Sequence, residues 1–134
     1  MNADIPETVG NLIGLAQKFQ HENGQFFPFG EVLNRGKHTY QASDKEDAKE
    51  AFRVLDHAYR EVAAEGFLEW AALCVDVRMT DAQLHPDGTD AIQVAYEEQD
   101  GQSTSYYVPY QERADGSIEY QPWFARDRAP CWFT

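Results

Sequence analysis

The first stretch of the chain places apolar side chains three or four positions apart, which is the period of a helix with one buried stripe. The apolar positions are Val9, Leu12, Ile13, Ala16 and Phe19. Asp4 and Glu7 have the spacing of a capping box, and Asn23 or Gly24 can take the left-handed conformation that often follows a helix. The pattern therefore predicts a helix over 5–22.

A second helical pattern runs for about five turns in the middle of the chain. Its apolar positions are Ala48, Ala51, Phe52, Leu55, Ala58, Tyr59 and Val62. Ser43 and Glu46 have capping-box spacing before it, and Gly66 follows it. Charged residues occupy the opposite side of the predicted helix, so we expect a helix over 44–65 with one solvated side.

Between the two predicted helices, and again after the second, apolar and polar residues alternate with a period of two. We predict strands over 26–33 and 37–42, joined by the Asn-Arg-Gly sequence at 34–36. After Gly66 the alternation changes phase near 71–73, which indicates a bulge or bend there.

Turn signals divide the last half of the chain into three or four more strands. His-Pro-Asp-Gly at 85–88 is typical of a tight turn, and Asp-Gly at 100–101 is the strongest hairpin signal. Ala-Asp-Gly-Ser at 114–117 predicts another hairpin that returns through a short strand at 118–120. The tail that follows has neither period.

These elements predict an α+β fold in a single domain over 1–134. Successive hairpins imply an antiparallel sheet, here of five or six strands, and helices with one apolar stripe imply that both cover one face of it in two layers. The order is helix, two strands, helix, then the remaining strands. We expect burial of Leu12, Ile13, Phe52, Leu55, Tyr59, Val75, Val94 and Val108.

The sequence Phe-Phe-Pro-Phe at 26–29 allows two interpretations. Pro28 has no N–H to donate, so the strand is an edge strand, starts there, or is bulged there. The aromatic residues around it belong either to the core or to a surface that contacts a partner.

Charge excludes some classes of function. The chain carries 23 acidic and 11 basic residues, for a net charge of −12. Binding to nucleic acid or to anionic membranes needs clustered Lys and Arg, so neither is expected. Residues 1–66 hold eleven acids and seven bases, net −4, and residues 67–134 hold twelve and four, net −8. With two cysteines and no apolar or basic leader pattern in the first ten residues, we expect a cytoplasmic protein.

Candidate catalytic residues are few. The four histidines have no metal-ligand spacing, and the sequence lacks phosphate-binding glycine loops, a nucleophile elbow and the zinc-protease motif. His85, Asp87 and Asp90 form the one polar cluster that suggests a pocket, either for a small enzyme or for a ligand-binding domain. The same residues suit a turn, so we predict a non-enzymatic protein without cofactor or metal.

Half of the aromatic residues lie in the last forty positions, within the more acidic half of the chain, and Tyr and Trp are enriched at protein interfaces. We predict that an acidic, aromatic sheet surface binds a locally basic protein partner. The candidate anchors are Tyr107, Trp123 and Trp132, and the candidate steering charges are Glu97, Glu98 and Asp100. A homodimer that buries the same aromatic residues is the alternative.

Three segments carry a resemblance to a family. "FFPFGEVLNRG", "HPDGTDAIQV" and "YYVPY" together resemble a group of small, uncharacterised bacterial proteins, over about residues 26–110. Acidic single domains of this size are similar in type to immunity proteins, which neutralise secreted bacterial toxins. The resemblance implies an immunity-like role and assigns no functional residues.

Overall fold

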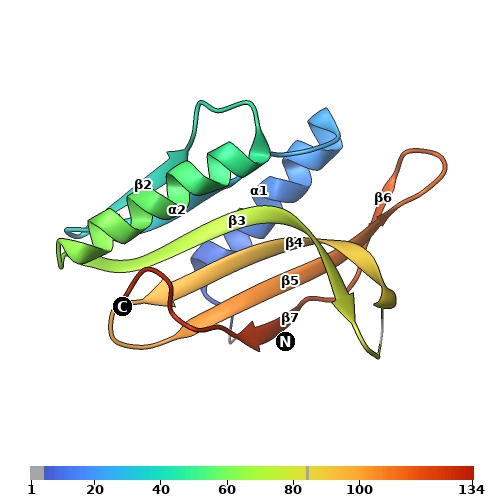
Figure 1. The fold of residues 1–134 in the computed structure, drawn as a ribbon. Coiled ribbons are helices and arrows are strands. Elements are labelled where there is room, and N and C mark those ends of the chain that lie inside the picture. The colour runs from blue at the N-terminus through green and yellow to red at the C-terminus, as the bar shows by residue number, and fades with distance from the viewer. Residues whose placement is uncertain (1–4, 84) are drawn as a thin grey trace.

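The computed structural model describes residues 5–83 and 85–134. In it, seven strands form an open antiparallel sheet, and two helices pack against this sheet (Figure 1). In chain order the elements are α1 (Glu7–Asn23), β1 (Phe29–Asn34), β2 (Lys37–Ala42), α2 (Ala48–Ala64), β3 (Leu68–Asp81), β4 (His85–Glu98), β5 (Ser103–Glu112), β6 (Ile118–Tyr120) and β7 (Phe124–Asp127). The α+β class, the antiparallel sheet and the predicted element order are confirmed. In this part of the chain no helix is long and apolar enough to cross a membrane.

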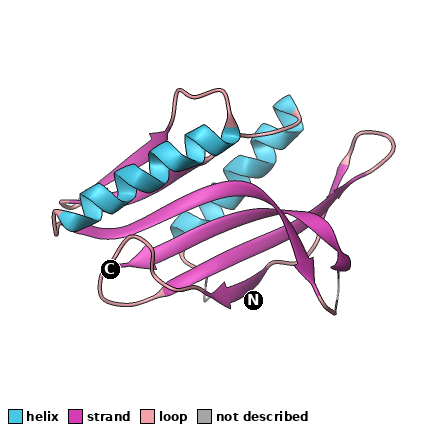
Figure 2. Cartoon of the chain, in the orientation of Figure 1, coloured by secondary structure: helices cyan, strands magenta, loops and turns pink. Residues whose placement is uncertain are grey.

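The sheet has the strand order β2-β1-β3-β4-β5-β6, and β7 also pairs with β5. The long strands β3, β4 and β5 form its twisted centre, and β2 lies at one end (Figure 2). The strand count exceeds the predicted five or six because the tail contributes β7, which pairs with residues 104–107 of β5. A strand of four residues is too short to produce a recognisable alternation.

The prediction that both helices cover one face is wrong, because they lie on opposite faces (Figure 1). We call these the α1 face and the α2 face. On β3, Ala72 and Cys74 belong to the core under α1, whereas Ala71 and Leu73 belong to the core under α2. A strand that is buried on both faces reads as a continuous apolar run. The apparent change of phase near 71–73 reflects this double burial, and the register shifts of β3 lie elsewhere, opposite 33–34 and at 79–81.

Close approach at Gly30 fixes α2 against the sheet. A Cβ atom at Gly30 would lie 2.1 Å from the carbonyl oxygen of Ala72 and 2.3 Å from the hydroxyl oxygen of Tyr59. The Tyr59 hydroxyl from α2 fills this space and donates a hydrogen bond of 2.9 Å to the Ala72 carbonyl. Only glycine leaves room for this contact between helix and sheet.

Both helices begin differently from the prediction. Asp4 lies outside the described residues, and Pro6 occupies the N-cap of α1 with no side-chain cap. At α2 the cap is Asp47, whose carboxylate accepts a hydrogen bond of 3.1 Å from the N–H of Glu50. Ser43 lies upstream in the preceding loop.

Six of the eight predicted core residues are buried, and two are not. Phe52 is 40% exposed and Val75 is half-buried. Both lie on the α2 face, where α2 covers only one end of the sheet. Phe52 does lie on the helix as its spacing predicts, but the sheet extends past this helix and leaves an open groove beside the ring.

The Phe-Phe-Pro-Phe segment belongs mainly to the core. Phe26 and Phe29 are buried under α1, and Phe27 is 43% exposed. Pro28 comes directly before β1, which pairs with β2 on one side and β3 on the other. Proline therefore marks the start of this strand, and β1 is an interior strand.

Candidate functional site

A half-open pocket on the α1 face combines acidic and aromatic side chains. It has a volume of about 410 Å³ and lies between the start of α1 and strands β1 to β4. Its lining residues are Pro6, Glu7, Thr8, Asn11, Glu31, His38, Trp70 and Tyr96, and we call it the acidic aromatic pocket. No Lys or Arg is among these lining residues, so the fixed charges at the pocket are negative.

Strand register explains why the pocket exists. Glu31 on β1 and Tyr96 on β4 are both register partners of Ala72 on β3, so the three side chains form one row across the sheet. Side chains in such a row point to the same face. Ala72 is small and fully buried, which leaves open space between the two larger side chains. Trp70, two residues earlier on β3, forms a wall of that space.

The Glu31 carboxylate is held in place from one side only. The Thr8 hydroxyl donates a hydrogen bond of 2.6 Å to Oε1, and Nδ1 of His38 lies 3.6 Å from the same oxygen. The other oxygen, Oε2, has no hydrogen-bond partner among the described residues. Since the Glu31 side chain is 29% exposed, Oε2 is available to a donor that enters the pocket.

The aromatic wall is ordered by its own contacts. The Trp70 ring lies edge-on to His38, with centroids 5.3 Å apart, and its centroid is 6.0 Å from that of Tyr96. The Tyr96 hydroxyl donates a hydrogen bond of 2.8 Å to Glu98. Burial, and then the adjacent Glu98, raise the pKa of Tyr96, so its hydroxyl remains protonated. Aromatic faces beside carboxylates are the surroundings that bind guanidinium and ammonium groups.

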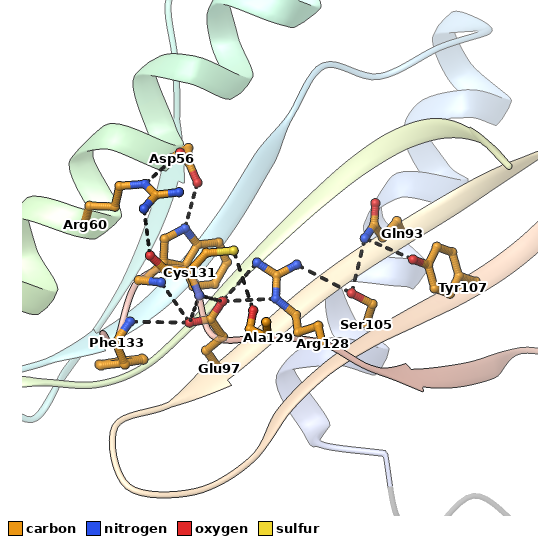
Figure 3. Close-up of polar contacts among 11 residues, drawn as sticks. Asp56, Arg60, Gln93, Glu97, Ser105, Tyr107, Arg128, Ala129, Cys131 and Phe133 are labelled. Carbon is orange, nitrogen blue, oxygen red and sulfur yellow. Dashed lines mark hydrogen bonds and ion pairs between the residues drawn. The ribbon is translucent and has the colours of Figure 1, made fainter.

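A buried carboxylate on the α2 face holds the C-terminal segment, residues 128–134 (Figure 3). Glu97 is 0% exposed, and its Oε2 lies 2.9 Å from Nη2 of Arg128. The carboxylate also accepts backbone hydrogen bonds of 2.9 Å from the N–H of Cys131 and 3.0 Å from the N–H of Trp132. This contact draws the segment against the sheet.

Helix α2 holds the same segment from above. Asp56 accepts hydrogen bonds from Nε1 of Trp132 at 2.9 Å and from Nε of Arg60 at 3.0 Å. Arg60 in turn donates through Nη1 to the Cys131 carbonyl at 2.9 Å (Figure 3). The Trp132 ring packs edge-on against Tyr59, at a centroid separation of 5.0 Å.

These contacts correct two predicted site residues. The sequence predicts Glu97 as a steering charge and Trp132 as a surface anchor, but the two residues are only 0% and 4% exposed. Glu97 belongs to β4 and is satisfied by Arg128 and by backbone N–H groups of the tail. Both residues serve the attachment of the C-terminal segment.

The structure separates the other four predicted partner-binding residues. Trp123 is half-buried beside Tyr106 on the α1 face, and Tyr107 is half-buried on the α2 face. Glu98 is half-buried near the acidic aromatic pocket, and Asp100 is exposed in the β4–β5 turn. They do not form one surface, and contact of any of them with a partner stays a prediction.

In the alternative cluster of His85, Asp87 and Asp90, His85 and Asp90 contact different partners. Residues 85–88 belong to β4, so the prediction of a turn there is wrong, and the turn comes before His85. His85 contacts Gln121 at 2.8 Å, and Asp90 pairs with Arg78 at 3.4 Å. Within 5–83 and 85–134, no group of three or more His, Cys, Asp or Glu side chains could hold a metal ion.

Sequence reasoning missed the residues that form the acidic aromatic pocket. They come from α1, β1, β2, β3 and β4, and no local motif connects them. One signal was present, because Glu31 is the only acid in the segment "FFPFGEVLN" and shares a strand face with Phe29 and Leu33. A single acid on an otherwise apolar face of a strand indicates a carboxylate with a specific role.

Comparison with protein-family models, curated proteins and solved structures finds no match to this chain. We therefore infer function from the geometry and charge of the chain itself.

Proposed function

We propose that this protein is a non-enzymatic protein-binding domain that recognises a locally basic segment of its partner. The observation that carries the proposal is the acidic aromatic pocket, where the free oxygen of Glu31 and the ring of Trp70 border the same space. A Lys or Arg side chain placed there gains a charge-assisted hydrogen bond and a cation–π contact together.

The net charge of the chain supports the same partner. At −12, the protein attracts basic molecules over distances longer than a contact, which raises the rate of association at low salt. An immunity-like role, in which the domain neutralises a basic toxin, is the specific form of this proposal. Its support is the acidic single domain of this size and the resemblance in sequence type described above.

A charge-matched pair of peptides tests the proposal. One is an acetylated and amidated octapeptide in which Arg alternates with Thr and Val, called the basic probe, and the other has Glu in place of Arg. Binding is measured by isothermal titration calorimetry at low and high salt. We expect the basic probe to bind and the acidic one not to bind, with affinity that falls as salt rises.

Two variants separate pocket binding from general attraction. Glu31→Gln should weaken binding of the basic probe about tenfold, the equivalent of one charge-assisted hydrogen bond. Glu112→Gln makes the same change in charge at an exposed position on β5, distant in strand order from β1, and should have little effect. Equal effects of the two variants, or no binding of the basic probe, would refute the proposed pocket.

A further inference from the structure

Strand β2 presents an open edge beside the acidic aromatic pocket. It is the first strand in the sheet order and pairs with β1 alone among the described strands. Five of its six residues are exposed, and it contains neither proline nor a register shift against β1. Its one lysine, Lys37, stands at the turn end of the strand, and an edge strand with so little protection is a place where another chain can add a strand.

Hairpin geometry shows which backbone groups of β2 point outward. Arg35 and Gly36 both have positive φ, 54° and 74°, as a two-residue turn of type I′ requires, and Asn34 pairs with Lys37 across it. The pair that closes such a turn exchanges hydrogen bonds, and bonded and non-bonded pairs then alternate along the ladder. The N–H and C=O groups of His38, Tyr40 and Ala42 therefore point away from β1.

The same edge leads to the pocket. Tyr40 is the register partner of Glu31, and His38 lines the pocket itself, so these side chains lie on the α1 face. A strand added to β2 would lie about 4.8 Å from it and about 9.6 Å from β1. A long basic side chain on that face can pass the exposed His38 and Tyr40 and meet the Glu31 carboxylate, whose Oε1 lies 3.6 Å from Nδ1 of His38.

From this juxtaposition we infer that β2 receives an extended segment of the partner as an additional strand, and that an Arg or Lys of this segment enters the acidic aromatic pocket. The inference rests on the proposed function and specifies how binding occurs. Main-chain hydrogen bonds supply affinity in this mode, and a pocket for alternate side chains supplies specificity. In the loop that follows β2, the exposed acids Asp44, Glu46 and Asp47 outnumber the one base, Lys45.

Charge favours a basic partner over a second copy at this edge. Pairing of β2 with β2 would bring together two chains of −12 each, and each copy would place its own Glu31 near the new interface. A basic segment reverses both effects, because it neutralises the carboxylates on the α1 face.

The experiment compares the basic probe with the same peptide methylated on alternate backbone nitrogens, in two versions of opposite phase. Methylation removes N–H donors and leaves every charge in place. We expect one version to bind at least about tenfold more weakly than the unmodified probe, because only one phase of N–H groups faces β2. Hydrogen exchange at His38, Tyr40 and Ala42 should slow when the unmodified probe binds.

A variant on the protein side provides the matching change. Ala42→Pro removes one outward N–H at a position where an edge strand tolerates proline, and Ala42→Ser keeps that N–H as a control. Ala42→Pro should lower the affinity for the basic probe several-fold, and Ala42→Ser should leave this affinity unchanged.

Three outcomes would overturn the inference, and they differ from one another. If Glu31→Gln weakens binding of the basic probe but methylation and Ala42→Pro do not, the inference of strand addition is wrong and the proposed function stands. If the basic probe does not bind at all, both fail. If sedimentation shows a dimer that Ala42→Pro dissociates, the edge belongs to a second copy and the basic segment does not bind there.

Discussion

Removal of the Glu97 carboxylate tests the attachment of the C-terminal segment. In Glu97→Ala, the Arg128 guanidinium, whose side chain is 19% exposed, loses its ion-pair partner, and the N–H groups of Cys131 and Trp132 lose their acceptor. Breaking one side of a buried ion pair costs about 3–5 kcal/mol, because the other charge stays buried without compensation. Release of the segment into water limits the loss, but it exposes Trp132, so we expect a decrease in unfolding free energy within that range.

Urea unfolding followed by circular dichroism measures this change, and Asp100→Ala is the matched control. Asp100 is an exposed acid in the β4–β5 turn, and its removal should change stability by less than about 0.5 kcal/mol. The double variant Glu97→Ala with Arg128→Ala should lose less unfolding free energy than the two single variants lose together, since the two side chains act as one unit.

Limited digestion with trypsin reports the segment directly. Cleavage after Arg128 should accelerate in Glu97→Ala, because the segment then leaves the sheet more often, and it should not change in Asp100→Ala. An unfolding free energy within about 0.5 kcal/mol of the wild type, together with an unchanged cleavage rate, would refute this account of the segment.

Three further predictions concern stability. Partial burial, together with the nearby Asp90, raises the pKa of the Asp76 carboxyl, against the hydrogen bond from Tyr110. The native state therefore holds this proton more tightly than the unfolded state, so stability is lost as pH rises from 3.8 through the raised pKa. Asp76→Asn should be more stable than the wild type at pH 7 and gain nothing below pH 3.8, as measured by urea unfolding at both pH values. Phe52→Ala should lower the free energy of unfolding by only about 1–2 kcal/mol in the same assay, because the ring is already 40% exposed. A decrease of about 4 kcal/mol or more, in the range for a fully buried Phe (~3–5 kcal/mol), would contradict the open groove. Gly30→Ala should cost about 3 kcal/mol or more, since its Cβ would lie 2.1 Å from the Ala72 carbonyl oxygen, and a neutral result would contradict the close approach.

The features predicted correctly from sequence are those set by local periodicity. The helix α2 and the Asp-Gly turn between β4 and β5 depend on local signals, and both are present near the expected positions. The prediction that both helices cover the same face of the sheet was wrong because an alternation with period two suggests a strand with one buried face. In β3, residues 71–74 are all buried, so both faces of the strand are covered. Double burial depends on which elements come to lie on each side, and that information is not local.

Most residues of the candidate site could not be predicted from sequence, because their contacts are also not local. Glu97 and Glu98 are adjacent acids in a strand, and alternation sends their side chains to opposite faces. One meets Arg128, 31 positions away, and the other meets Tyr96 beside the acidic aromatic pocket. No pattern within a window of ten residues distinguishes the fully buried Glu97 from the half-buried Glu98.

The three tryptophans allow one measurement of the central claim, which is that a basic segment binds at the acidic aromatic pocket. Trp70 lines the pocket, Trp123 packs on the α1 face near Tyr106, and Trp132 lies under α2. In protein labelled with 5-fluorotryptophan, each gives its own fluorine resonance. We predict that titration with the basic probe shifts the Trp70 resonance and leaves the other two in place. A shift of Trp123 or Trp132 without one of Trp70, or no shift during binding, would contradict the claim.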